Sequence, residues 1–529
     1  MVPLLIHLLA HGDFYFSRPV QDGGDFAANA LRIRDAKTFQ EIHGNYSRWG
    51  FNHPGPALFY AYAWGELLFH DLLHLSPAPH NAHALTLLLL QSALFAAAVA
   101  VCRRFITGPA FVPLVLALGL THFWLAKHAF TSLWPPHQFL MAFVLMLVSA
   151  AAVAAGDRRV LPLLVLACCL CVHAHVAQPL FAVPLFALAL VSAVARAPGP
   201  GVAARLRSVL LTQAGAISLG LIALFLVPIA VDALRGEDSN LQVILDHMRR
   251  HASEGHSLSQ SLSYLLAFLT YWGFHDQLSG VPAGRFILQH PGAFAAWAAI
   301  LLLPAVRLLR PRPADAATPF RRALWAVFAL SLALTLVWGR IMDGEMWAFN
   351  AFFNYGILFL PLIVVADVLS GLLPEAWGRR SPWALAPVAA LLLVALRPDD
   401  VMSDSHRPPL DARALVSAAV GPTVTVPEDA ALVLTFGPGY WPQVIALAIQ
   451  LERAGIPWRV TEDWGFMFGR KRTLRSLPPG QPTVCLEASP AGPKDAPAAQ
   501  YEGVAFRAVR FGHSGACSGA PSVTGKTEG

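Results

Sequence analysis

Charged side chains are scarce in this sequence, because Asp, Glu, Lys and Arg make up only 13% of its 529 residues. A typical soluble domain carries about 25%. The net charge of +6 is not gathered into a basic patch interleaved with aromatic residues, as in nucleic-acid-binding proteins. The six cysteines show no spacing typical of a zinc site. These shortages argue against an ordinary soluble domain, a nucleic-acid partner and a cysteine-ligated metal.

Apolar residues are abundant instead, at 56%, and they form long runs. A membrane crossing needs about 20 mainly apolar residues. Its backbone polar groups must bond to one another, which favours helices. The sequence therefore predicts an all-α polytopic membrane protein. Helices are expected near residues 83–102, 108–126, 133–155, 160–174, 176–195, 208–234, 293–309, 323–338, 349–373 and 383–396. With a first helix at the N-terminus, the expected total is about 11.

The first ten residues, MVPLLIHLLA, are too short to cross a membrane. They lack the preceding Lys or Arg of a signal peptide. We expect them to belong to a first helix whose upstream half is missing from this reading frame.

The arginines predict the orientation, because Lys and Arg gather in cytoplasmic loops. They cluster at 103–104, 158–159, 196–207, 307–322 and 379–380. These loops all lie inside only if the apolar stretch 259–274 is interfacial or re-entrant. This arrangement predicts a bacterial inner-membrane protein with the segment 11–81 and the C-terminus in the periplasm.

Two domains are expected, a membrane domain over 1–400 and a soluble periplasmic α/β domain over 401–529. In the second domain, residues 431–437 predict a strand and 440–456 predict a helix with an apolar stripe. Further strands are expected at PWRVTED, PTVCLEA and VAFRAVRFG, and the last dozen residues are predicted to be disordered. We expect this domain to dock on or cap the membrane domain. If it lies outside the cell, Cys485 and Cys517 are expected to form a disulfide.

The first outer segment contains two carboxylates, Asp22 and Asp25, just after the first helix. A carboxylate at this position can act as a general base toward an acceptor hydroxyl or amine. The D-G-G-D pattern is also good turn chemistry before a helix. Helices are expected at about 26–40 and 56–74, lying along the membrane surface.

Further polar groups surround these carboxylates. Asn52 and His53 begin an N-H-P-G-P turn that leads into an aromatic helix. His53 can contact a phosphate or a carboxylate, although proline in a first turn also simply starts a helix. Cations that match phosphate oxygens are supplied by Arg18, Arg32, Arg34 and Arg48. Each of these arginines can equally face solvent or lipid headgroups.

Three later loops, TSLWPPHQF (131–139), HAHVAQP (173–179) and WGRIMDGEMWAFN (338–350), are expected to open toward one outer cavity. Polar residues at membrane depth are costly and usually functional, although helix capping also explains them. The candidate substrate-binding residues in these loops are His137, His175, Gln178, Arg340 and Glu345. His173 and His175 are not expected to bind metal, because residues two apart point to different faces.

This layout resembles the GT-C superfamily of polyprenyl-phosphate-sugar glycosyltransferases. Its members include protein O-mannosyltransferases, aminoarabinose transferases that modify lipid A, and rhizobial lipopolysaccharide galacturonosyltransferases. Many members have a D-E-A-R-Y-x-x-x-A motif early in the first outer loop and a later K-P-P-L-type turn. In this sequence Asp22, Phe26 and Ala30 keep the D, Y and A spacing, and HPGPALFY stands in the place of the turn. The second acidic position is Gly23.

The resemblance implies that Asp22 is the catalytic base and that His53 lies near the donor phosphate. Asp25 stays a second candidate catalytic carboxylate, although its position also suits a cap for the following helix. The acidic pair has been linked to metal in some relatives, so a divalent metal stays open, and the sequence requires no other cofactor. The function expected is inverting transfer of a sugar from a polyprenyl-phosphate donor to a lipopolysaccharide, glycan or protein acceptor of the cell envelope. The alternative is a transporter or flippase, although the polar clusters gather at one surface and no internal repeat is seen.

Overall fold

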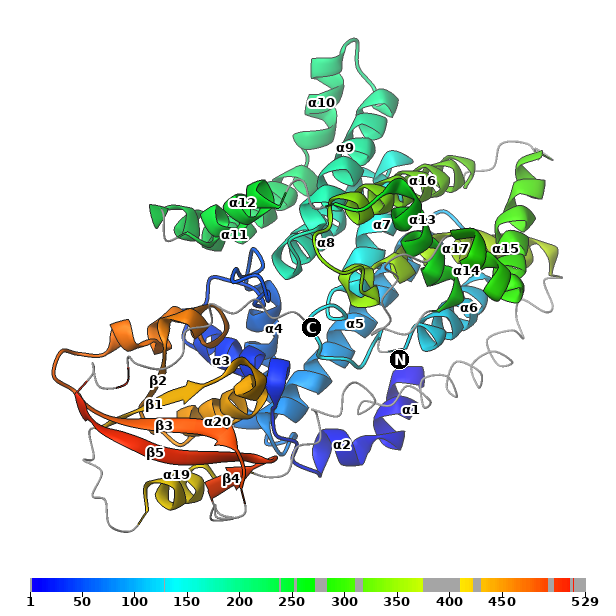
Figure 1. Ribbon diagram of the computed structural model, residues 1–529. Coiled ribbons are helices and arrows are strands. Elements are labelled where there is room, and N and C mark those ends of the chain that lie inside the picture. Colours follow the sequence, from blue (N-terminus) through cyan, green and yellow to red (C-terminus); the bar gives the residue numbers. More distant parts are fainter. Residues whose placement is uncertain are drawn as a thin grey trace.

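The computed structural model describes residues 2–127, 129–236, 239–251, 255–271, 283–309, 317–373, 410–421, 430–492, 499–513 and 517. These residues are mostly helical, with a small sheet near the C-terminus (Figure 1). Five of the helices are long and apolar enough to cross a membrane. They are α5 (Pro79–Arg103), α9 (Gln178–Arg196), α11 (Gln213–Ala233), α16 (Thr318–Ile341) and α17 (Asn354–Leu372).

Shorter helices complete the bundle. The apolar ones are α6 (Phe111–Leu125), α7 (Leu140–Ala154), α8 (Leu161–Ala174), α13 (Leu258–Ala267) and α15 (Pro291–Leu309). Three others are α10 (Val202–Leu210), α12 (Asn240–Arg250) and α14 (Ala283–Gln289).

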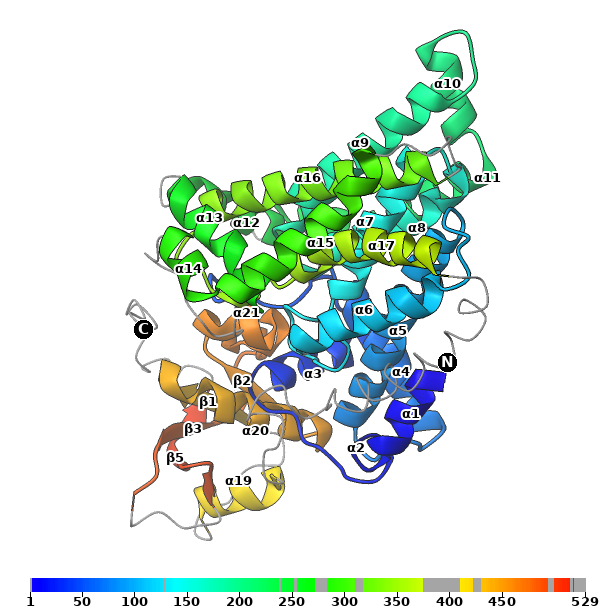
Figure 2. The same ribbon diagram turned by 90° about the vertical axis from the view of Figure 1, so that its right-hand side faces the viewer.

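Helix α7 is the centre of the bundle. All its residues are buried, and α5, α8, α9, α16 and α17 pack around it (Figure 2). A helix that is apolar on every side is stable only when it is enclosed in this way. Helix α11 is the opposite case, because it leaves Leu219, Leu224 and Val227 exposed. An apolar outer surface of this extent indicates contact with lipid.

The bundle has two chemically different ends. At one end Arg104 pairs with Asp157 at 2.5 Å, Arg196 donates to the carbonyl of Ala154, and Arg158 donates to that of Ser208. These contacts join the ends of α5, α7, α9 and α10 to one another and to the turn before α8. The opposite ends of α7, α8 and α9 carry the loops 131–139 and 175–177. The arginines at 103–104, 158–159 and 196–207 and these two loops therefore lie at opposite ends of the bundle.

The N-terminal segment forms α1 (Val2–Ala10), α2 (Gly12–Phe16), α3 (Gly24–Lys37) and α4 (Ala57–Glu66), which continues as a π-helix over Leu67–Leu72. The helices expected at 26–40 and 56–74 are therefore present. Helix α4 packs on α3 and α5, and its outer side exposes Trp64, Leu68 and Leu72. Residues four apart share one helix face, so the exposed side is an apolar stripe that suits a membrane interface.

The C-terminal domain is a five-stranded sheet with the order β2-β1-β3-β5-β4. The strands are β1 (Ala431–Phe436), β2 (Trp458–Val460), β3 (Pro482–Pro490), β4 (Gln500–Tyr501) and β5 (Val504–His513). Strand β1 is parallel to β2 and β3, whereas β5 is antiparallel to β3 and β4. Helix α20 (Trp441–Arg453) connects β1 to β2, and α19 (Ala412–Val420) packs on β5. The expected disulfide between Cys485 and Cys517 is formed.

Helix α3 belongs to two cores at once. Phe26, Ile33 and Ala36 pack into the core of the helical bundle. Ala27, Ala28, Ala30 and Leu31 pack into the core of the C-terminal domain. In both ribbon views α3 lies between the bundle and the sheet (Figures 1 and 2). The small alanine side chains allow α20 to approach this helix closely.

A buried ion pair fixes this contact. The Arg472 guanidinium donates to both carboxylate oxygens of Asp35, at 2.7 and 2.8 Å, and it also contacts Glu452 at 2.9 Å. Lys471 lies 2.6 Å from Asp35. Burial alone would raise the pKa of Asp35, but the hydrogen bonds and charges of Arg472 and Lys471 outweigh it and leave the pKa below its ordinary value.

The structure confirms a mostly helical chain with a small α/β domain but shows five candidate spans rather than about 11. Expected helices up to 349–373 are present, although α7 begins only at Leu140, after the Trp134-Pro135-Pro136 stretch. The helix expected at 383–396 lies outside the described residues. Within 259–274, α13 and a 3₁₀ turn end at Thr270, which is too short for a span, and residues 272–274 are not described.

The Arg472–Asp35 pair predicts a stability test. Replacing Arg472 by Met leaves a buried carboxylate short of its main partner, so we expect a loss of about 3–5 kcal/mol in the free energy of unfolding. Arg475→Met is the control, because the Arg475–Glu462 pair spans 3.7 Å at the surface and exposed pairs contribute about 1 kcal/mol at most. Thermal unfolding in detergent measures both. Equal losses of unfolding free energy in the two variants would contradict a stabilising role for the Arg472–Asp35 pair.

The same pair predicts a pH dependence. The pKa of Asp35 is lowered in the folded protein, so its stabilisation is complete above the unfolded value of 3.8 and disappears as the pH falls through the folded pKa. The stability difference between wild type and Asp35→Asn should therefore shrink below about pH 4.

Candidate functional site

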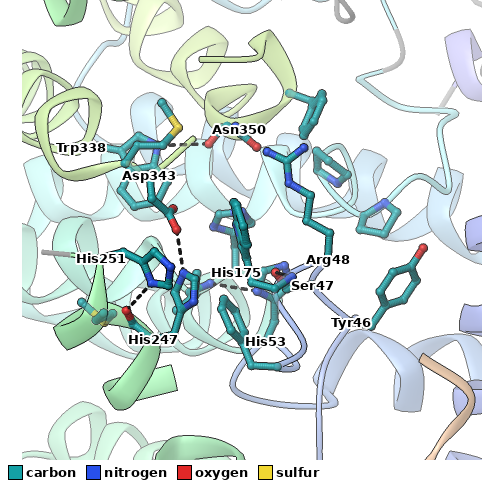
Figure 3. Close-up of a pocket in the computed structure, with 18 of the residues that line it drawn as sticks. Tyr46, Ser47, Arg48, His53, His175, His247, His251, Trp338, Asp343 and Asn350 are labelled. Carbon is teal, nitrogen blue, oxygen red and sulfur yellow. Dashed lines mark hydrogen bonds and ion pairs between the residues drawn. The ribbon is translucent and has the colours of Figure 1, made fainter. Parts of the chain in front are cut away.

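A cavity of about 490 Å³ opens at the end of the bundle that faces the C-terminal domain (Figure 3). The three loops expected to share one cavity do so, because Trp134, His175 and Asp343 all line it. The remaining wall comes from the first outer segment and from α12. Its apolar surface is provided by Trp49, Phe51, Met248, Trp338, Met342 and Phe349.

A hairpin over residues 44–53 forms one side of the cavity. Tyr46 bridges Asn52, the Ser47 amide donates to the Phe51 carbonyl at 2.8 Å, and the His53 amide donates to the Asn45 carbonyl at 2.7 Å. Tyr46, Phe51 and His53 line the cavity. Asn52 instead lines a second, more polar cavity of about 960 Å³ beside the C-terminal domain. The hairpin therefore lies between the two cavities.

Asp25 is the carboxylate of the first outer segment that reaches the 490 Å³ cavity. It is half-buried in the first turn of α3, where Tyr46 Oη donates to Oδ1 and Trp134 Nε1 donates to Oδ2 at 2.6 Å. Burial and the neighbouring Asp25 charge raise the pKa of Tyr46 well above its usual value, so this hydroxyl keeps its proton. An indole N–H can only donate. Both groups therefore donate to the Asp25 carboxylate, which is the acceptor in each contact.

The rings of His53 and His175 lie against each other, with centroids 4.6 Å apart and their planes tilted by 33°. The Val176 amide donates to His53 Nδ1 at 3.3 Å, and the Ala177 amide donates to His175 Nδ1 at 3.1 Å. Burial, and then His175, lower the pKa of His53 well below its usual value, and burial lowers the pKa of His175 to about 4. Both rings are therefore neutral at pH 7, with Nε2–H as the donor. They offer hydrogen bonds rather than positive charge.

Helix α12 is held in place by buried polar contacts at its start. Asp232, at the end of α11, accepts hydrogen bonds from the backbone amides of Asn240 and Leu241 and from the His43 ring at 2.8 Å. Asn240 and Asn52 exchange two hydrogen bonds, at 2.7 and 2.8 Å. The position of α12 is thus fixed relative to the hairpin.

The far end of α12 and the loop after α16 meet at the cavity. His247 Nε2 donates to Asp343 Oδ2 at 2.7 Å, and His251 Nδ1 donates to the His247 carbonyl at 2.9 Å. Figure 3 shows these three side chains on one side of the cavity, Tyr46 on the other, and Arg48 between them. Gly344 follows Asp343 with φ +69°, and a β-carbon there would lie 3.3 Å from the Trp49 ring. This turn aims Asp343 at the histidines.

Several predicted site residues lie away from this cavity. Arg18 is exposed beside Asp13, and Arg340 is exposed at the end of α16. His137 is buried against Ser132, and Gln178 is buried at the start of α9. Glu345 contacts Asn350 through its backbone carbonyl, which accepts from the Asn350 amide. Asn52 faces the polar cavity, so the predicted residues that meet at the 490 Å³ cavity are Asp25, Arg48, His53 and His175.

Asp22 is buried in a different environment. Its carboxylate accepts from His80 Nδ1 at 2.9 Å and from Arg453 Nη2, in the C-terminal domain, at 2.6 Å. Burial would raise the pKa of Asp22, but Arg453 and then His80 hold it well below the usual range. A carboxylate with such partners is a weak base. The role of Asp22 as catalytic base stays a prediction, and the geometry of the cavity favours Asp25.

The acidic pair that has been linked to metal in some relatives does not fit a cation here. Its second position is Gly23, the Asp22 oxygens contact His80 and Arg453, and the Asp25 oxygens contact Tyr46 and Trp134. We therefore assign no reaction step to a metal at this pair.

No family model matches the chain, and no curated protein matches it significantly. The GT-C resemblance thus rests on the residues quoted for it.

The sequence analysis missed three residues of the cavity, Tyr46, His247 and His251. Tyr46 carries no sequence signal, because its role depends on the fold of the hairpin. The two histidines do carry one, since H-M-R-R-H places them four apart, on one face of a helix.

The environment of Asp22 predicts a structural phenotype. Asp22→Asn removes the charge that neutralises Arg453, so we expect a loss of about 3–5 kcal/mol in the free energy of unfolding. Asp13→Asn is the matched control, because Asp13 lies in the same segment but is exposed. Thermal unfolding of both purified variants measures this loss. If the Asp22 variant is as stable as the Asp13 control, Asp22 does not stabilise the fold through Arg453.

Proposed function

We propose that the protein is a membrane glycosyltransferase that moves a sugar from a polyprenyl-phosphate donor onto a cell-envelope acceptor. The observation that carries the proposal is that the Asp25 carboxylate and the Arg48 guanidinium line the same aromatic-walled cavity. A lipid-linked sugar phosphate needs an apolar surface for its chain, a cation for its phosphate and a base for the attacking acceptor. The cavity offers each of these in the protein's own side chains.

The reaction follows from this placement. Asp25 takes the proton of an acceptor hydroxyl or amine as its oxygen or nitrogen attacks the anomeric carbon of the sugar. The bond between that carbon and the phosphate oxygen breaks, and the polyprenyl phosphate leaves with the bonding electrons. Attack from the side opposite the leaving group inverts the anomeric configuration.

The leaving phosphate gains negative charge, and preorganised donors stabilise such charge most effectively in a site shielded from water. Arg48 supplies the positive charge, and its guanidinium lies 5.1 Å from the Trp49 ring centroid, which holds it at the cavity wall. The Nε2–H of His53 supplies a neutral hydrogen bond. Tyr46 and Trp134 hold the Asp25 carboxylate in place.

We also propose the membrane arrangement expected from the sequence, with about 11 crossings in a bacterial inner membrane. The five long helices would be joined by the other apolar helices of the bundle. The cavity and the C-terminal domain would face the periplasm. Two features support this orientation, the arginine-rich loops at the opposite end of the bundle and the Cys485–Cys517 disulfide, which is typical of oxidising compartments.

The orientation predicts the behaviour of reporter fusions. Alkaline phosphatase folds only after export, so a fusion after residue 529 should be active, and a green fluorescent protein fusion at the same point should stay dark. An inactive but stable phosphatase fusion together with a fluorescent partner would reverse the orientation.

The assignment of the base predicts a loss of transfer in one variant. Asp25→Asn keeps the size of the side chain but removes its basicity, so the transfer rate should fall by about 10²–10⁴-fold. The measurement uses purified protein, labelled polyprenyl-phosphate sugars and cell-envelope acceptors. Asp13→Asn, an exposed carboxylate of the same segment, is the control with unchanged turnover.

The Asp22 variant separates the two candidate bases. Turnover per folded molecule should survive Asp22→Asn, because we assign Asp22 to the contact with the C-terminal domain. An inactive Asp22→Asn beside an active Asp25→Asn would make Asp22 the base, as the resemblance implies. If wild type moves a labelled lipid phosphate across vesicles without forming any glycosidic product, the transporter alternative replaces this proposal.

A further inference from the structure

We propose that His247, His251 and Asp343 form a binding site for a divalent transition-metal ion, with Zn²⁺ as the ion that fits best. The sequence analysis predicted no metal ligands, and this set shares no residue with the acidic pair of the family motif. Among the described residues, these three side chains are the group whose ligand atoms come together, all within 4.8 Å of one another. The inference does not depend on glycosyl transfer.

The spacing along the chain gives two of the ligands. His247 and His251 lie four residues apart, at the end of α12, so both rings project from one face. Their ring centroids are 4.2 Å apart. Pairs of histidines with this spacing on a helix are a common zinc-binding arrangement. The third ligand, Asp343, comes from a separate element and already lies 2.7 Å from His247 Nε2.

The hydrogen bond of His251 leaves the ring nitrogen that a cation requires. His251 Nδ1 donates to the His247 carbonyl at 2.9 Å. The proton is thereby fixed on Nδ1, and Nε2 keeps the lone pair that a metal requires. Metal-binding histidines almost always have their second nitrogen held by such a partner. At His247, the cation takes the place of the proton in the hydrogen bond to Asp343.

The surroundings hold the ligands in place. The Asp232 and Asn240 contacts fix the start of α12, and the turn at Gly344 fixes Asp343. The Trp49 ring covers both histidines, with centroids 5.4 Å and 6.1 Å from theirs. Zinc–ligand bonds of about 2.0–2.2 Å require the three atoms to draw closer together. Small rotations of the two rings and of the carboxylate provide this movement.

The donor set indicates the kind of ion and what it does. Two imidazoles and one carboxylate suit Zn²⁺ and other late first-row ions better than Mg²⁺ or Ca²⁺, which prefer oxygen ligands. Three protein ligands leave a coordination position open, as in catalytic zinc sites. All three residues line the 490 Å³ cavity, so the open position faces it. A water molecule or a phosphate oxygen can occupy that position.

The chain also contains a matched control. His70 and His74 are four residues apart, and His74 Nδ1 contacts the His70 carbonyl at 3.0 Å, as in the other pair. His70 Nδ1, however, contacts the Ser76 carbonyl at 2.8 Å, and among the described residues no third ligand joins the pair. His74→Gln therefore removes a histidine with the same spacing and the same ring-to-carbonyl contact without touching the proposed site.

The experiment measures metal alone, without substrate. Full-length protein is purified in detergent through a tag that contains no histidine, stripped with chelator, titrated with Zn²⁺ and analysed for bound metal by mass spectrometry. Wild type and His74→Gln should bind one tight equivalent. In His247→Gln and Asp343→Asn the affinity for Zn²⁺ should fall by more than about 100-fold. Removing a residue that only hydrogen-bonds to a metal ligand costs less than this. Asp343→Glu, which retains a carboxylate, should recover much of it.

Thermal unfolding of the apo proteins shows that each variant is folded, and added Zn²⁺ should raise the melting temperature of wild type but not of His247→Gln. The proposal is overturned if wild type binds no tight equivalent. It is also overturned if folded His247→Gln and Asp343→Asn bind Zn²⁺ as wild type does, or if His74→Gln loses it equally. These Zn²⁺-binding results do not depend on whether the protein transfers sugar.

Discussion

The structure depends on one helix that two domains share. Helix α3 contributes Phe26 and Ile33 to the core of the bundle and Ala28 and Leu31 to that of the C-terminal domain. Asp35 in this helix and Asp22 just before it are buried carboxylates, and they pair with Arg472 and Arg453 of that domain. An unpaired buried charge is costly. The first turn of α3, and with it Asp25, therefore keeps its place only while the C-terminal domain is docked.

Docking of the C-terminal domain on α3 gives different surroundings to two carboxylates that look alike in sequence. Asp22 faces the C-terminal domain and accepts from Arg453 and His80, whereas Asp25 faces the cavity and accepts from Tyr46 and Trp134. Two similar acids thus acquire different properties from their surroundings, one as part of an ion pair and the other as an accessible acceptor. The C-terminal domain acts on the cavity through this arrangement although its sheet forms none of the cavity wall.

Much of the fold could be predicted from the sequence, because long apolar runs have few structural solutions. The expected helices over 83–102 and 349–373 and the strand over 431–437 are present. The candidate site was predictable only in part. The family spacing pointed to Asp22, but its partner Arg453 lies 431 residues away, and no local pattern reveals such a contact. Helix α12 was missed because it is short and mostly polar, so it lacks the apolar signal that found the others.

The same separation has a consequence for how the protein is made. A chain emerging from the ribosome exposes its first outer segment at the start of synthesis, while Arg453 and Arg472, the cationic partners of Asp22 and Asp35, are made much later. Until then α3 has no second core to enter, and its alanine face stays open to solvent or chaperones. Completion of the cavity is thus coupled to completion of the polypeptide. Truncated products that retain the five long helices would leave Asp22 and Asp35 without their counter-charges and would be recognised by quality-control proteases.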